Sequence, residues 1–97
     1  MQHTFRAELW LWDARKSASW TFVTLPAELS DELREASVPG RGFGSIRVEI
    51  SIGTSTWQTS IFPDKQSGCY TLPIKAAMRR AQSIAAGDWV QISLTTI

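Results

Sequence analysis

The feature that most constrains the fold is a strict alternation of apolar and polar residues in the middle of the chain. From Ser45 to Ile52 every second residue is apolar, and each residue between them is polar. Successive side chains of a β-strand point to opposite faces, so this pattern predicts a strand with one face in the core and one in solvent. The turn residues Gly53 to Ser55 and the β-branched, aromatic run Thr56–Phe62 predict the returning strand of a β-hairpin.

Other segments extend this hairpin into a larger sheet. Four further segments have strand composition: Phe5–Trp12, Trp20–Leu25, Cys69–Pro73 and Asp88–Thr95. Helical periodicity begins at Pro26 and continues to Ala36, and it returns from Ile74, with Gly87 at the position of a left-handed C-terminal cap. The fold class predicted is mainly β: a small antiparallel β-barrel of six to seven strands with two short helices, in one domain over residues 1–97.

Composition excludes several classes of protein. With 97 residues, 43% of them apolar and 20% charged, the chain has the make-up of one globular domain. A net charge of +1 gives no long-range attraction to DNA or to an anionic membrane, so any such contact has to be local. One cysteine and one histidine cannot close a zinc site or form an internal disulfide. No apolar run approaches the roughly 20 residues of a bilayer span, so we expect no membrane contact. We expect a cytoplasmic domain with no metal and no cofactor.

Several short motifs follow one another in an order that covers most of the chain. They are Phe5–Ala7, Trp20–Val23 with Leu25-Pro26, the Ile46–Ile52 strand, Ser60–Pro63, Tyr70–Arg79 and Gly87–Val90. This order resembles a family of small bacterial proteins known only as a domain of unknown function, with a double-split β-barrel fold. The resemblance implies such a barrel and no established activity. In outline the barrel is similar to those of transition-state regulators and antitoxins, which dimerise and bind DNA, although a shared fold does not transfer a function.

Catalytic residues have little support in this sequence. A hydrolase needs a nucleophile with a base in reach, and the single histidine is His3, near the N-terminus. Cys69 opens a predicted strand with no evident activator, which favours a small buried side chain. The acids between Glu28 and Glu35 are typical of a solvated helix face. We predict that the chain is not an enzyme.

A basic stretch supports the first functional hypothesis, nucleic-acid binding. The segment Lys65–Arg80 contains four basic residues and no acid. Lys75 and Arg79 are four residues apart and share a helix face, with Arg80 about 100° away. Together with Arg41 they are candidate phosphate contacts. The alternative, which the low net charge favours, is a solvated helix face that complements the acidic helix.

Five tryptophans are the most unusual part of the composition. Trp20, Trp57 and one of Trp10 and Trp12 are predicted to fill the core of the barrel. Trp10 and Trp12 lie on the face of their strand opposite to Leu9 and Leu11.

Trp89 likewise lies opposite to the apolar face of the last strand, and Phe43 stands in a glycine-rich loop. Outward aromatic side chains form protein interfaces, or stacking platforms for sugars and unpaired bases. We favour cover by the helices or self-association in a homodimer over a ligand platform. The second hypothesis is therefore a protein-interaction or small-ligand barrel that uses Trp10, Trp12, Phe43 and Trp89. In either case the prediction is a non-catalytic binding or assembly module.

Overall fold

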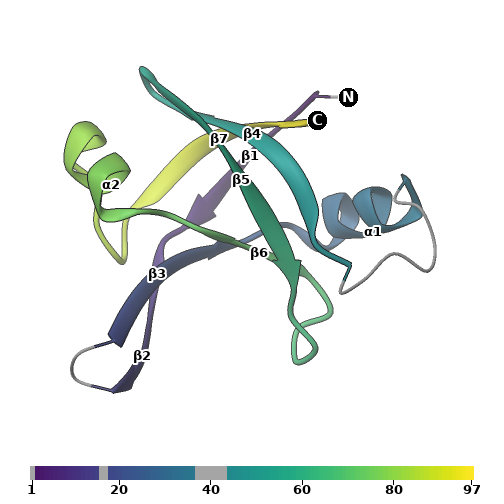
Figure 1. The fold of residues 1–97 in the computed structure, drawn as a ribbon, viewed down its shortest axis with the longest axis horizontal. Coiled ribbons are helices and arrows are strands. Elements are labelled where there is room, and N and C mark those ends of the chain that lie inside the picture. Colours follow the sequence, from purple (N-terminus) through teal and green to yellow (C-terminus); the bar gives the residue numbers. More distant parts are fainter. Residues whose placement is uncertain (1, 16–17, 37–43) are drawn as a thin grey trace.

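The computed structural model describes residues 2–15, 18–36 and 44–97, and within these it has seven antiparallel strands and two helices (Figure 1). The strands are β1 (Gln2–Glu8), β2 (Trp10–Arg15), β3 (Ala18–Thr24), β4 (Ile46–Ile52), β5 (Ser55–Pro63), β6 (Tyr70–Pro73) and β7 (Trp89–Thr96). The helices are α1 (Ala27–Ala36) and α2 (Ala76–Gln82). The strand order is β1-β7-β4-β5-β6-β3-β2, in a sheet that curls into a half-barrel. The predicted fold class, mainly β with six to seven strands and two short helices, is confirmed.

The N-terminal segment joins the two ends of this strand order. β1 pairs with β7 and β2 pairs with β3, and only Leu9 separates β1 from β2. Leu9 itself still pairs with the entry to β7: its N–H donates to the Asp88 carbonyl at 2.9 Å, and its carbonyl accepts from the Gly87 N–H at 2.7 Å. The single strand predicted over Phe5–Trp12 is therefore wrong. The chain changes partners at Leu9, and Leu11, beyond that point, is 52% exposed.

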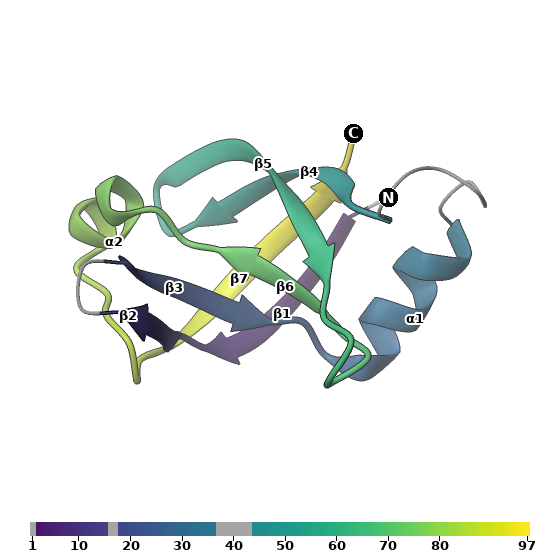
Figure 2. The ribbon, with the colours of Figure 1, turned by 60° about the horizontal axis from the view of Figure 1, so that its bottom comes forward.

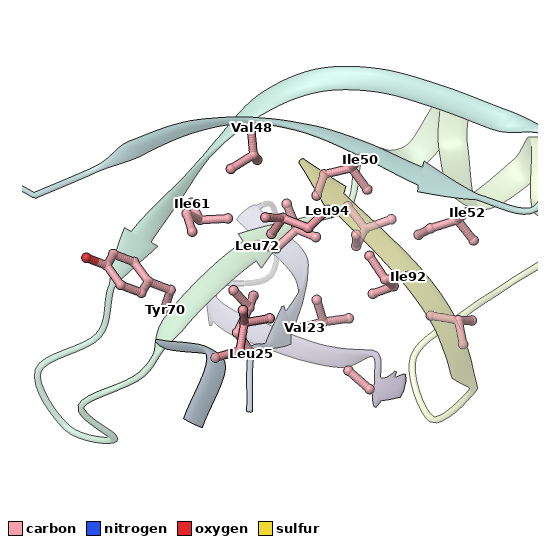
Figure 3. Packing of buried hydrophobic residues seen from close by; sticks show 14 of the residues in the cluster. Val23, Leu25, Val48, Ile50, Ile52, Ile61, Tyr70, Leu72, Ile92 and Leu94 are labelled. Carbon is pink, nitrogen blue, oxygen red and sulfur yellow. The ribbon is translucent and has the colours of Figure 1, made fainter. Parts of the chain in front are cut away.

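The core lies on the concave side of the curled sheet, where side chains from distant strands converge (Figure 3). Val48 and Ile50 of β4 meet Ile61 of β5, Leu72 of β6 and Leu94 of β7, and all five are fully buried. Val48 and Ile50 lie in the core because every second residue of β4 points inward, as the alternation of apolar and polar residues predicted. Each such side chain contributes about 1.5–3 kcal/mol by burial, as an upper estimate.

Helix α1 covers one end of the half-barrel (Figure 2). Leu29 and Leu33, four residues apart, are buried in the core cluster, as the helical period predicts. Between them, the buried Ser30 hydroxyl accepts a hydrogen bond from the Tyr70 N–H at 3.1 Å. The Arg34 guanidinium lies 5.6 Å from the centre of the Tyr70 ring. These contacts attach α1 to the start of β6.

Helix α2 is shorter than the sequence predicts. It ends at Gln82, and the left-handed residue that follows is Ser83, with a φ of 54°, so the prediction of Gly87 as the cap is wrong. Gly87 instead forms the turn into β7, where its N–H is needed by Leu9. The Gln82 amide nitrogen donates to the hydroxyls of Thr54 and Ser55, at 3.1 and 2.8 Å. This pair of bonds ties α2 to the turn between β4 and β5.

Candidate functional site

The outer face of β2 and β3 carries large aromatic side chains in register. Trp10 lies opposite Phe22, and Trp12 lies opposite Trp20. Side chains of directly paired residues project from the same face of a sheet, so these four rings form one surface. Phe62 of β5 lines the same depression. We call the surface formed by Trp10, Trp12, Trp20, Phe22 and Phe62 the aromatic platform.

The rings of the platform order one another. Phe22 stacks against Trp10 with ring centres 5.2 Å apart and planes inclined by 29°. It also stacks against Trp20, at 6.4 Å and 24°. The Trp10 indole N–H donates to the Thr24 hydroxyl at 2.9 Å, which fixes that ring on the sheet. Each aromatic pair adds about 0.5–1.5 kcal/mol beyond its buried area, so the platform is organised without a ligand.

Three rings of the platform remain in contact with water. The exposed fractions are 47% for Trp12, 55% for Trp20 and 46% for Phe62. The platform rings line an open depression of about 720 Å³, and among the described residues none of α1 or α2 lines it. A depression of this size is within the range of ligand sites in proteins, roughly 300–1,000 Å³. A contiguous group of exposed aromatic rings is a feature of binding surfaces rather than of a free sheet face.

One end of the depression is polar. Asp64 and Gln66, which follow β5, line it there. The Asp64 carboxylate accepts a hydrogen bond from the Gln66 N–H at 3.2 Å and another from the Ser67 hydroxyl at 3.0 Å. Both carboxylate oxygens thus hold the turn that contains them, as aspartate often does beside a turn. Asp64 is the one charged side chain among the described residues that line the depression.

At the opposite end of the platform the chain passes from β6 into the later part of the basic stretch, Lys75 to Arg80. Phe22 lies opposite Pro73, and the Ile74 N–H donates to the Thr21 carbonyl at 2.9 Å, which continues the same register by one pair. Trp20 precedes Thr21 and Lys75 follows Ile74, so both residues come directly after this last bonded pair. The Lys75 backbone is extended, with φ −66° and ψ 151°, before the chain enters α2. The chain therefore leads from Pro73, which lines the depression, into Lys75 and α2, which the sequence analysis assigned to a separate hypothesis.

The predicted phosphate contacts have different surroundings. Lys75 and Arg80 are exposed, whereas Arg79 is half-buried and its Nε donates to the Ile74 carbonyl at 3.3 Å. None of these three makes an ion pair within the described residues. The exposure of Lys75 and Arg80 fits the alternative of solvated helix charge, but they do not complement the acidic helix, because α1 and α2 lie at opposite ends of the molecule (Figures 1 and 2). Arg41 lies outside the described residues.

Two of the predicted core tryptophans, Trp57 and Trp20, differ in burial. Trp57 is buried in the core, as expected. Trp20 was expected there too, and that prediction is wrong. Thr21 and Val23 are the buried residues of β3, so the alternation of the strand turns Trp20 outward.

Of the other predicted interface residues, some belong to the aromatic platform and one lies elsewhere on the sheet. Trp10 is half-buried, but by Phe22 on the outer face rather than by the core, and Trp12 is exposed beside it. Trp89 points outward as predicted and is 60% exposed, on β7 in the other half of the sheet. It does not line the depression. Phe43 lies outside the described residues.

The residues considered for catalysis lie in ordinary structural surroundings. Cys69 is half-buried, less than predicted, and its thiol lies 3.8 Å from the Ser67 carbonyl. His3 on β1 lies 3.9 Å from the Glu32 carboxylate of α1. In the part of the chain that the structure describes, no three His, Cys, Asp or Glu side chains gather as metal ligands. Of the helices in those ranges, neither α1 nor α2 has the length and apolar character of a transmembrane span.

Comparison with known proteins places the whole sheet in one family. The sequence profile described as a domain of unknown function (DUF1905) matches residues 5–94, from β1 to β7. The chain belongs to the DUF1905 family. A search of the curated proteins finds no match. The DUF1905 match agrees with the resemblance to a domain of unknown function, and it includes the aromatic platform and the basic stretch. The description of the DUF1905 family names no activity, so the role of the platform has to be argued from its geometry.

Proposed function

We propose that this DUF1905 domain is a non-catalytic binding module and that the aromatic platform is its binding surface. The observation that carries the proposal is the presence of half-exposed rings on an outer sheet face: Trp12, Trp20 and Phe62. The stacked contacts of Phe22 order part of this surface before any ligand binds. A pre-ordered surface loses little side-chain entropy on binding, which favours affinity.

The lining of the depression supports binding over catalysis. The two lining groups that could take part in catalysis, the Asp64 carboxylate and the Thr71 hydroxyl, both form hydrogen bonds within the domain. Asp64 holds its own turn, and the Thr71 hydroxyl donates to the Phe62 carbonyl at 3.2 Å. Flat apolar rings are instead suited to ligands with flat faces, such as sugars and unpaired bases.

Self-association is the second candidate. β2 is the last strand of the sheet order, and it carries Trp10 and Trp12. A second copy that met this strand would cover apolar surface on both copies. The resulting homodimer would use the same face as the ligand and would therefore exclude it.

Fluorine NMR of the chain labelled with 5-fluorotryptophan tests the proposal, because five tryptophans give five reporters. The probes are a mononucleotide, a short oligo(dT) and the neutral oligosaccharide cellohexaose. We expect the resonances of Trp12 and Trp20 to shift with at least one probe while those of Trp57 and Trp89 stay in place. Movement of Trp89 alone, or no shift with any probe, would overturn the proposal. A shift of Trp12 and Trp20 with protein concentration alone would favour the homodimer.

A further inference from the structure

We infer that the aromatic platform binds single-stranded nucleic acid, with bases stacked on Trp12 and Trp20 and phosphates contacted by Lys75 and Arg80. This inference rests on the proposed function and names the ligand of that surface. It joins the two hypotheses that the sequence kept apart, because the chain continues from Pro73, which lines the depression, directly into Lys75 and α2.

The first support is the register of β3 and β6. The hydrogen bond from the Ile74 N–H to the Thr21 carbonyl continues the pairing of Phe22 with Pro73. Neighbouring strands lie about 4.8 Å apart, so the extended Lys75 backbone stands about one strand spacing from that of Trp20. A lysine side chain spans more than that distance. A base on the Trp20 indole would therefore have its own phosphate within reach of the Lys75 ammonium group, which is the combination that single-strand sites use.

The second support is the distribution of charge. The sequence has no acid between Asp64 and Asp88, a segment that includes all of α2. Within the described residues Lys75 and Arg80 have no ion-pair partner, and both are exposed. The acids of α1 lie at the other end of the molecule (Figure 2). A net charge of only +1 thus conceals a locally positive segment, which contains Lys75 and all of α2.

The position of the exposed rings favours nucleic acid over the other occupants. Two of the three half-exposed rings are Trp12 and Trp20, which pair with each other, and Trp20 lies one residue from the bond between Thr21 and Ile74, which leads into Lys75. A neutral sugar would gain nothing from Lys75. A second copy seated on the platform would bring its own Lys75 towards the interface, where like charges repel. A duplex is also a poor ligand, because its bases are already stacked on one another.

Fluorescence anisotropy of a labelled oligo(dT) of about 12 nucleotides tests the inference on the full chain, at about 50 and about 200 mM salt. Base stacking on an aromatic ring contributes about 1–3 kcal/mol, so we expect Trp20→Ala and Trp12→Ala each to raise the Kd about 5- to 150-fold. Lys75→Ala and Arg80→Ala should each weaken binding and lower the slope of log K against log salt by about 0.7. Trp89→Ala and Arg47→Ala, an exposed ring and an exposed cation in the other half of the sheet, should leave the Kd unchanged.

Three results would overturn the inference: no binding at the lower salt, equal binding of an oligo(dT)·oligo(dA) duplex, or a Kd unaffected by Trp20→Ala. Thermal unfolding of each variant, followed by circular dichroism, separates lost binding from lost folding. If oligo(dT) fails to bind and cellohexaose still shifts the Trp12 and Trp20 resonances, the inference fails and the proposed function stands. If no probe shifts them, both fail.

Discussion

The two halves of the sheet have similar interiors and different outer faces. In the half formed by β1, β7, β4 and most of β5, outward positions are mainly polar, as where Glu49 of β4 lies opposite Gln58 of β5. In the half formed by β2, β3 and β6, the corresponding outward pair is Trp12 and Trp20. The inward residues do not differ in this way, since Ile50 in the first half and Leu72 in the second are both fully buried.

The comparison distinguishes residues that stabilise the fold from residues that are suited to binding a partner. A sheet with one face on the core needs only polar residues on the other face, as the first half shows. The aromatic rings of the second half leave apolar surface in water, which the core does not require. We therefore attribute the inner faces to stability and the aromatic platform to binding.

The largest effect is expected from the inner faces. Ile50→Ala and Leu72→Ala each remove a fully buried side chain and leave a cavity, so each should lower the free energy of unfolding by about 2–5 kcal/mol. Urea denaturation followed by circular dichroism measures both. A much smaller loss for Leu72→Ala than for Ile50→Ala would mean that the platform half is less well packed, and the two interiors would no longer be equivalent.

An intermediate effect on stability is expected where α2 is attached to the turn between β4 and β5, in the half of the sheet with polar outward residues. Gly53 has a φ of 57°, and a Cβ added there would overlap the carboxamide of Gln82. Gly53→Ala should cost about 2 kcal/mol, from a left-handed alanine and from the lost bonds of Gln82 to the hairpin. Gly68→Ala is the matched control, because its φ is 75° and nothing lies near its added Cβ. It should cost about 1 kcal/mol, and equal losses would show that the Gln82 contact contributes nothing.

The smallest effect on stability is expected from the outer faces. Trp20→Ala loses the stacked contact with Phe22 and should lower the free energy of unfolding by about 1 kcal/mol. Glu49→Ala in the polar half should change it by less than about 0.5 kcal/mol. Thermal unfolding measures both variants. If Trp20→Ala destabilised the chain as much as Leu72→Ala does, the platform would be a structural element and the comparison would fail.

Elements with a local pattern were predictable from the residues alone. The alternation from Ser45 to Ile52 predicted β4, and the spacing of Leu29 and Leu33 predicted the buried face of α1. Both succeed because the residues that define the element are neighbours in the chain, so one periodicity fixes which side chains point inward. The mainly β fold class follows from the same evidence.

Which strand faces are buried depends on contacts between segments that are distant in the chain. Trp20 was expected in the core of the barrel, and it is exposed because the core lies on the other face of β3, where Thr21 and Val23 are buried. The partner change at Leu9 depends on β7, which lies at the far end of the chain. The pairing of Phe22 with Pro73 joins β3 to a strand that follows it in the chain only after α1, β4 and β5. A local pattern shows which side chains of one strand share a face, and it does not show which distant strand pairs with it.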